Sequence, residues 1–231
     1  MILSSEQQIV DATIKGRRSI RAFLPTPVSA EDLRAILDVA ARAPSGVNIQ
    51  PWKVYVLTGA SKARLSAAIQ AAFNDPAQAA SHQEEYRYYP VEWKSPFQER
   101  RRKVGLDLYS LLGLGRQDKE GMQRQLGRNY NFFDAPVGLI FTIDRVLEQG
   151  SWLDYGTFLQ NIMLAARARG LDTCPQAAFT NYHKIIADVL ELPANEQLVC
   201  GMSLGFADPD KIENSLITER DPVQSFTKFL D

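Results

Sequence analysis

The sequence predicts an α+β domain in which a central mixed β-sheet is flanked by helices. Two apolar runs, 136–143 (PVGLIFTI) and 197–204 (QLVCGMSL), are typical of buried strands. Amphipathic helical segments lie between them without a regular alternation of strand and helix, which favours a layered α+β fold. The chain has 231 residues, 45% hydrophobic and 23% charged, so it can form one well-packed domain spanning 1–231.

The first half of the chain contains two helix-capping patterns. Ser4 with Gln7 predicts the start of one helix. Ser29 with Asp32 predicts the start of a second helix, which the Pro, Gly and Asn residues of 44–48 interrupt. The other elements expected here are a strand at 53–58 (KVYVLT) and an alanine-rich helix at 61–73.

Residues 74–130 differ from the rest because they are polar, strongly charged and rich in aromatic side chains. We expect them to form a helical excursion from the core and not a separate domain, since their apolar content is too thin for a core of their own. Further helices are expected at 151–169 and at 181–191. The polar residues 207–231 are expected to form an extended C-terminal arm that a partner subunit holds, because so long a tail does not suit a compact monomer.

Several classes of protein are excluded by composition. A net charge of −1 gives no basic field for nucleic acid. Two cysteines make no disulfide framework, and the two histidines have no metal-ligand spacing around them. No apolar run approaches the roughly 20 residues that a membrane helix needs, and 1–6 is too short and polar for a signal peptide. We therefore expect a cytoplasmic protein without metal, membrane or nucleic-acid partners.

Arg17, Arg18, Ser19 and Arg21 lie within five positions of one another. In an extended segment Arg17, Ser19 and Arg21 project to the same side, because side chains alternate along a strand. Guanidinium groups, a hydroxyl and backbone N–H groups together suit a phosphate. The alternative is a solvated basic turn, and these four residues alone do not exclude it.

The loop 44–52 (PSGVNIQPW) combines an irregular backbone with neutral hydrogen-bonding side chains. Ser45, Asn48 and Gln50 could bind a heteroaromatic ring that carries carbonyl and N–H groups at its edge. Alternatively, the loop is only a helix-to-strand connection whose polar side chains satisfy the backbone.

Together these two segments resemble the FMN-dependent nitroreductase family, and the resemblance extends along most of the chain. PVGLIF resembles the central strand of that family, and 201–205 (GMSLG) its last core strand. The segment 170–178 (GLDTCPQAA) resembles the loop beside flavin N5, and Arg220 in 217–220 (ITER) resembles the C-terminal phosphate arginine. The excursion 74–130 and the ending PQAAF are similar to the branch that reduces nitrobenzoates and nitrophenols, and this resemblance implies that the excursion lies over the active site.

The resemblance implies roles for particular residues. The basic segment and Arg220 would hold the FMN phosphate and ribityl chain. Pro44, Ser45 and Asn48 would contact the flavin from the other subunit. The ring near N5 would be lined by Pro175, Gln176 and Ala177. Near flavin N1 and O2 the resemblance suggests Arg128, with Asn131 second.

One departure from the family pattern lies in the N5 loop. The family often has Glu-Gly where this chain has Ala177-Ala178, so backbone contacts stay possible but an acidic side chain is lost.

The implied reaction is ping-pong reduction of nitroaromatic compounds, and possibly quinones, by NADPH or NADH through bound FMN in a homodimer. Flavin N5 would carry the hydride, so no side chain is assigned a catalytic role. Reductive dehalogenation, flavin reduction and flavin cleavage use the same FMN site and stay open. A flavin-binding sensor or storage protein without rapid turnover is the alternative from outside the enzymes.

Other conspicuous residues have structural interpretations. The run 100–103 (RRRK) could guide an acidic acceptor or the NADPH phosphate, but a solvated helix face is the simpler hypothesis. The aromatic residues of 86–97 could line an acceptor channel, pack the excursion onto the core, or do both. Cys174 adjoins the N5 loop, and we expect inert packing because no basic residue is next to it in the sequence.

Overall fold

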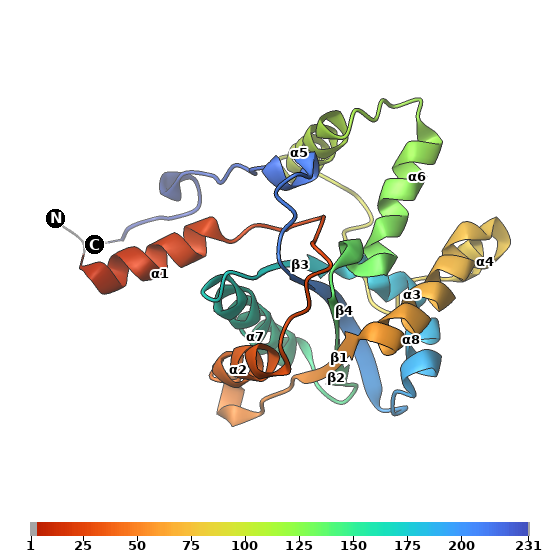
Figure 1. Cartoon of the computed structure of the whole chain (residues 1–231). Coiled ribbons are helices and arrows are strands. Elements are labelled where there is room, and N and C mark those ends of the chain that lie inside the picture. Colours follow the sequence, from red (N-terminus) through yellow and green to blue (C-terminus); the bar gives the residue numbers. More distant parts are fainter. Residues whose placement is uncertain (1–3, 231) are drawn as a thin grey trace.

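The computed structural model describes residues 4–230 and has an α+β architecture of three layers. A four-stranded sheet in the order β1-β2-β4-β3 forms the middle layer, with α2 and α7 on one face and α3 and α8 on the other (Figure 1). The strands are β1 Lys53–Thr58, β2 Val137–Asp144, β3 Asp172–Gln176 and β4 Glu196–Gly205. The helices are α1 Ser5–Gly16, α2 Ala30–Ala40, α3 Gly59–Asn74, α4 Pro76–Ser81, α5 Phe97–Leu111, α6 Lys119–Gly127, α7 Gln149–Arg167 and α8 His183–Leu190.

The sheet differs in one respect from the expected mixed sheet: neighbouring strands are antiparallel throughout. After β1 the chain returns to the same end of the sheet, where Thr58 faces Val137, so β2 runs the opposite way. Within the described residues, parallel pairing is limited to an isolated bridge between Ser19 and Thr173.

The predicted elements agree with the structure at most positions. Both capping patterns are present: Ser4 and Gln7 form a capping box, and the Ser29 hydroxyl accepts from the Asp32 N–H at 2.9 Å. The excursion 74–130 contains α4, α5 and α6. Residues 172–176 form strand β3, where we expected only a connection leading into the next helix. The first three residues, part of the signal-peptide argument, lie outside the described residues.

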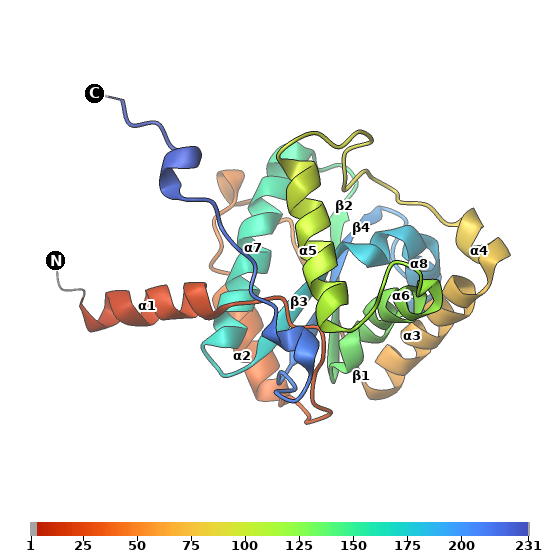
Figure 2. The same ribbon diagram turned by 90° about the horizontal axis from the view of Figure 1, so that it is seen from above.

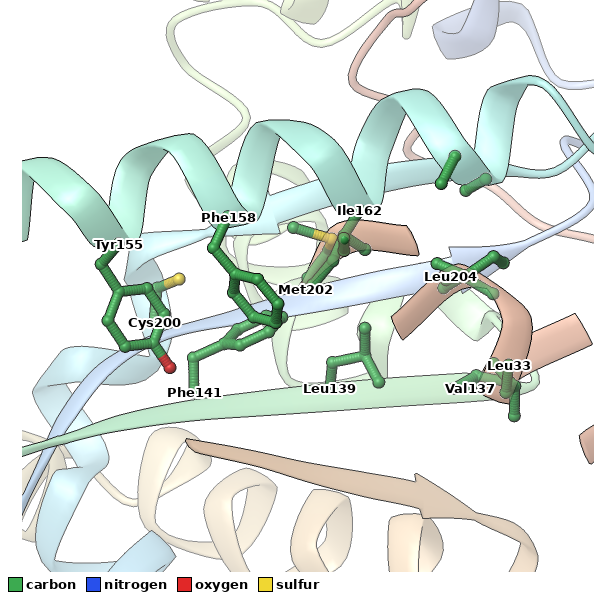
Figure 3. Close-up of a cluster of buried hydrophobic side chains, with 14 of the residues drawn as sticks. Leu33, Val137, Leu139, Phe141, Tyr155, Phe158, Ile162, Cys200, Met202 and Leu204 are labelled. Atoms are coloured by element: carbon green, nitrogen blue, oxygen red, sulfur yellow. The ribbon is translucent and has the colours of Figure 1, made fainter. Parts of the chain in front are cut away.

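One face of the sheet packs against α2 and α7. Val137, Leu139 and Phe141 alternate along β2 toward these helices, as the period of a strand requires. Figure 3 shows Phe158 and Ile162 of α7 pointing down onto this row of side chains. These side chains are at most 2% exposed, so the face is a dry core.

The opposite face leaves room for two aromatic rings. Gly138 of β2 and Gly201 of β4 lie at neighbouring register positions, and a Cβ there would come within 2.6 Å of the Phe132 ring and within 2.3 Å of the Phe179 ring. The two rings lie 4.6 Å apart. Phe132 belongs to the 3₁₀ segment η2 (Arg128–Asp134) and Phe179 to η3 (Ala177–Tyr182). The sheet glycines therefore bring η2 and η3 together.

Helix α1 and the residues after η4 (Ile212–Ser215) project away from the layered body on the same side (Figure 2). Helix α1 has no buried residue, and Ile9 is 67% exposed. Near the other end of the chain, beyond the short 3₁₀ segment η5 (Val223–Ser225), Phe229 is 82% exposed. Within 4–230, every helix is too short or too polar to cross a membrane.

A buried carboxylate ties three strands together at one end of the sheet. Glu196 of β4 accepts hydrogen bonds from Lys53 Nζ at 3.0 Å, Tyr55 OH at 2.8 Å and Thr142 Oγ1 at 2.6 Å. Burial alone would raise the pKa of Glu196, but these three hydrogen bonds together hold it below its ordinary value of 4.5. The ionised form is therefore the one that stabilises the fold.

We expect Glu196→Gln to lower the free energy of unfolding at pH 7 by about 2 kcal/mol, because the charged acceptor of three hydrogen bonds is lost. A depressed pKa contributes stability above the ordinary value and loses it as pH falls through the folded value. The difference in the free energy of unfolding between wild type and Glu196→Gln should therefore shrink below about pH 4. Urea unfolding at several pH values measures it, with the exposed Glu92→Gln as control. A difference that grows toward acid pH would contradict the assignment.

Candidate functional site

A cavity of about 910 Å³, here called the first cavity, lies where the end of α1, the segment after it, α7 and the C-terminal segment meet. It brings together five of the predicted residues from the two chain ends, Arg17, Arg18, Ser19, Arg21 and Arg220, with Pro175 of β3. Its other lining residues are Ile14, Lys15, Gly16, Gln160, Met163, Arg167, Leu216, Ile217 and Thr218.

The segment after α1 is extended and runs beside β3. Ile20 N donates to Thr173 O at 3.1 Å, and Ser19 forms its parallel bridge to the same residue. Ile20 is 1% exposed, so its side chain anchors the segment in the core while its neighbours face the cavity. Arg17, Ser19 and Arg21 share one side as expected, but Arg18 lines the same cavity, so only Ile20 follows the alternation toward the core.

Positive charge dominates the first cavity. Arg17, Arg21 and Arg220 form no ion pair with any carboxylate of residues 4–230, and the described lining contains no acidic side chain. Burial, and then the charge of Arg220, lower the pKa of Arg17. Two lining cations are exceptions, because Arg167 pairs with Asp172 at 3.1 Å and Lys15 pairs with Asp11 at 3.1 Å. The cavity therefore offers unneutralised guanidinium groups to an anion.

Asn214 of η4 holds this basic segment in place. Its Oδ1 accepts from Arg21 N at 2.8 Å, and its Nδ2 donates to Ala22 O at 2.8 Å and to Asp208 O at 2.9 Å. Its backbone oxygen accepts from Arg18 Nη1 at 3.0 Å. Sequence reasoning missed Asn214, because a single asparagine in a polar tail carries no local signal.

A second cavity of about 410 Å³ adjoins the first, since Arg21 and Pro175 line both. The excursion supplies one wall, and η2, β3 and η3 supply the other. The remaining lining residues are Glu84, Tyr89, Leu108, Tyr109, Gln125, Leu126, Asn129, Tyr130, Phe133, Cys174, Gln176, Ala177, Ala178 and Asn181. Aromatic rings and amides dominate this cavity, in contrast to the cations of the first, so it suits a flat ring with polar edges.

Pro175, Gln176 and Ala177 lie together at the junction of β3 and η3 and all line the second cavity. The Gln176 side chain supports the wall, because its Nε2 donates to Asn129 O at 2.8 Å and its Oε1 accepts from Ser203 Oγ at 2.6 Å. Burial raises the pKa of the neighbouring Cys174 to about 11, so this thiol stays protonated at neutral pH.

Arg128 and Asn131 lie outside both cavities. The Arg128 guanidinium pairs with Glu213 at 2.5 Å and with Asp134 at 3.1 Å, so its charge is neutralised within η2 and η4. The polar groups that do reach the second cavity from this side are Gln125 and Asn129, which sequence reasoning left out.

Pro44, Ser45 and Asn48 also lie outside both cavities, in the loop around η1 (Gly46–Asn48). Gly46 N donates to Asp154 Oδ2 at 3.0 Å, which ties this loop to α7. Val47 and Asn48 have left-handed backbones with φ of 45° and 62°, and Val47 is 95% exposed. Val47 is therefore a β-branched residue held in a strained backbone conformation with its side chain in solvent.

Comparison with known proteins gives a consistent result. The family model described as the nitroreductase family matches residues 14–206. The chain is 46% identical over 220 residues to a 4-nitrobenzoate reductase of Pseudomonas putida, covering 95% of each chain. It is 42% identical over 221 residues to a chloronitrobenzene nitroreductase of Comamonas testosteroni, covering 96% of each. It also resembles the crystal structure of the FMN and NADPH-dependent nitroreductase NfnB from Sphigopyxis sp. strain HMH, with a TM-score of 0.92, 33% identity, and 96% and 99% of the chains covered.

We expect Asn214→Ala to lower the free energy of unfolding by about 3 kcal/mol, because it leaves the N–H of Arg21 and the carbonyls of Ala22 and Asp208 without their partner. Urea unfolding measures the change. The control is Ser215→Ala, an exposed neighbour whose hydroxyl bonds only locally. A loss no larger than that of the control would show that Asn214 does not hold the segment.

Proposed function

The chain belongs to the nitroreductase family, and we propose that it is an FMN-dependent enzyme that uses NADPH or NADH to reduce nitroaromatic compounds, with quinones as further acceptors. The observation that carries this proposal is the pair of adjoining cavities, one cationic and one aromatic, joined at Arg21 and Pro175. Relatives that share 42–46% of their residues with this chain are named for nitroaromatic substrates, and the related NfnB is FMN- and NADPH-dependent, which supports both substrate class and cofactor.

The residues present fit FMN. Arg17, Arg21 and Arg220, whose charges no carboxylate of residues 4–230 neutralises, offer guanidinium groups for a phosphate in the first cavity, with Arg18 and Ser19 beside them. Tyr130 and Phe133, with the other rings and amides of the second cavity, offer surroundings for a flat heteroaromatic ring. When bound, FMN supplies the hydride and electron chemistry that no side chain of this chain can supply.

The chain's own residues would bind and orient the cofactor and the acceptor, and they would exclude water from the site. The excursion covers the second cavity with Tyr89, Leu108 and Tyr109, which favours flat acceptors and limits access of water. Burial raises the pKa of Tyr130, so this phenol stays neutral at physiological pH. Arg21 carries a positive charge at the junction of the cavities, where it can stabilise negative charge on a bound ring.

A homodimer is part of the proposal. Helix α1 and the C-terminal segment expose Ile9, Val10, Phe226 and Phe229, which a second copy could cover. The exposed loop carrying Pro44, Ser45 and Asn48 would then contact the flavin held by the partner. We also propose a cytoplasmic location, since a nicotinamide donor and two free cysteines fit a reducing compartment.

The purified protein should show a flavin absorption spectrum, directly or after FMN is added. Anaerobic NADPH or NADH should bleach it, and 4-nitrobenzoate should then restore it, because the two half-reactions occur in turn. Bound flavin that neither nicotinamide bleaches would instead favour a sensor or storage protein. A protein that binds no flavin even with added FMN would contradict the cofactor assignment.

Mixing two inactive variants tests whether the flavin site spans two subunits. Arg21→Ala and Asn48→Ala should each lose most of the nitroreductase activity. After subunit exchange at equal concentrations, half of the dimers would be hybrids, each with one intact site, so about a quarter of the wild-type activity should return. Mixed variants that stay as inactive as the separate ones, although exchange is verified, would show that both residues serve the same subunit's site or that no shared site exists.

A further inference from the structure

Gln125 carries a buried hydrogen-bond donor that has no partner. It lies near the end of α6, lines the second cavity and is 8% exposed. Its Nε2 forms no hydrogen bond with any of residues 4–230. A buried donor left without an acceptor destabilises the protein, so its presence beside a cavity calls for an explanation by a ligand.

The neighbouring arginine determines which way the amide points. Gln125 Oε1 accepts from Arg128 Nη1 at 3.5 Å, and Arg128 is itself held by Glu213 and Asp134. A guanidinium group has only donors, so the amide oxygen must face Arg128 and the amide nitrogen must face elsewhere. The carboxylates that neutralise Arg128 therefore also fix the direction of the Gln125 donor.

Two of the other amides that line this cavity, Gln176 and Asn129, already have partners, and the remaining one, Asn181, is only half-buried. Gln176 donates to Asn129 and accepts from Ser203. Asn129 donates to Leu126 O at 3.0 Å, and its Oδ1 accepts from Gln176 at 3.3 Å. Gln125 is thus the amide of this wall whose donor is both buried and free within the described residues. What it lacks is an acceptor oxygen.

We propose that Gln125 Nε2 donates a hydrogen bond to a carbonyl oxygen on the pyrimidine edge of the FMN ring, and that this bond decides which edge of the ring enters the second cavity. The inference rests on the proposed function. The FMN phosphate is directed to the cations of the first cavity, so the ring is the part of FMN that lies in the adjoining second cavity beside Gln125. Only the pyrimidine edge carries carbonyl oxygens, because the opposite edge carries methyl groups.

The test is Gln125→Leu, with flavin affinity and thermal stability measured separately for the apoprotein and the FMN-bound protein. FMN should bind about fivefold more weakly, as expected for one lost hydrogen bond. The apoprotein should melt at the same or a higher temperature, because an unpartnered buried donor has been removed. If the leucine variant does not fold, Gln125→Met removes the donor with an unbranched side chain.

The matched control is Ser66→Ala. Ser66 is also 8% exposed and its hydroxyl also lacks a partner among the described residues, but it lies on α3 and lines neither cavity. This variant should leave FMN affinity unchanged. The comparison therefore distinguishes the effect of removing a buried polar group without a partner from the effect of losing a contact with the ligand.

Three results would overturn the inference. Unchanged FMN affinity in the Gln125 variants would show that no bond to the ring exists. Unchanged affinity with a raised KM for 4-nitrobenzoate would assign the donor to the acceptor substrate instead. An apoprotein less stable than wild type, with unchanged FMN affinity, would assign Gln125 a purely structural role. Failure of the wild-type protein to bind FMN would instead remove the proposed function on which this inference rests.

Discussion

The extended segment from Arg17 to Ala22 is held from two sides, and both cavities depend on this restraint. On one side Ile20 bonds to β3, and on the other Asn214 bonds to the backbone of Arg21 and Ala22. Both contacts are made by backbone groups of the segment and not by its charged side chains. Most of the positive charge is therefore left free, while the backbone that carries it is rigid.

The second cavity depends on the sheet in a different way. Gly138 and Gly201 lack side chains where Phe132 and Phe179 approach, and the two rings hold η2 against η3. These 3₁₀ segments supply the aromatic and amide residues of the cavity wall. The missing side chains of Gly138 and Gly201 thus shape the wall of the second cavity, although neither glycine lines it.

Features that a short stretch of sequence determines could be predicted, whereas features that depend on distant contacts could not. The strands 136–143 and 197–204 and both helix caps were predictable because short-range pattern determines them. Strand β3 could not be predicted. It lies at the edge of the sheet, where Pro175 is tolerated, and it forms through pairing with β4. The basic segment was predictable from its side chains, but Asn214 and Gln125 were not. Their importance arises from contacts with residues far away in the sequence or from a missing contact, and neither leaves a local pattern.

The uneven distribution of charge in this nearly neutral chain has a kinetic consequence. With a net charge of −1, the molecule as a whole neither attracts nor repels anions strongly. The first cavity nevertheless gathers Arg17, Arg18, Arg21 and Arg220, and a cleft lined by charges of one sign focuses the field at its mouth. Anionic ligands are therefore guided to this opening over distances comparable to the Debye length, about 10 Å at 0.1 M ionic strength. Added salt slows their encounter with the protein more than it weakens contacts that have already formed.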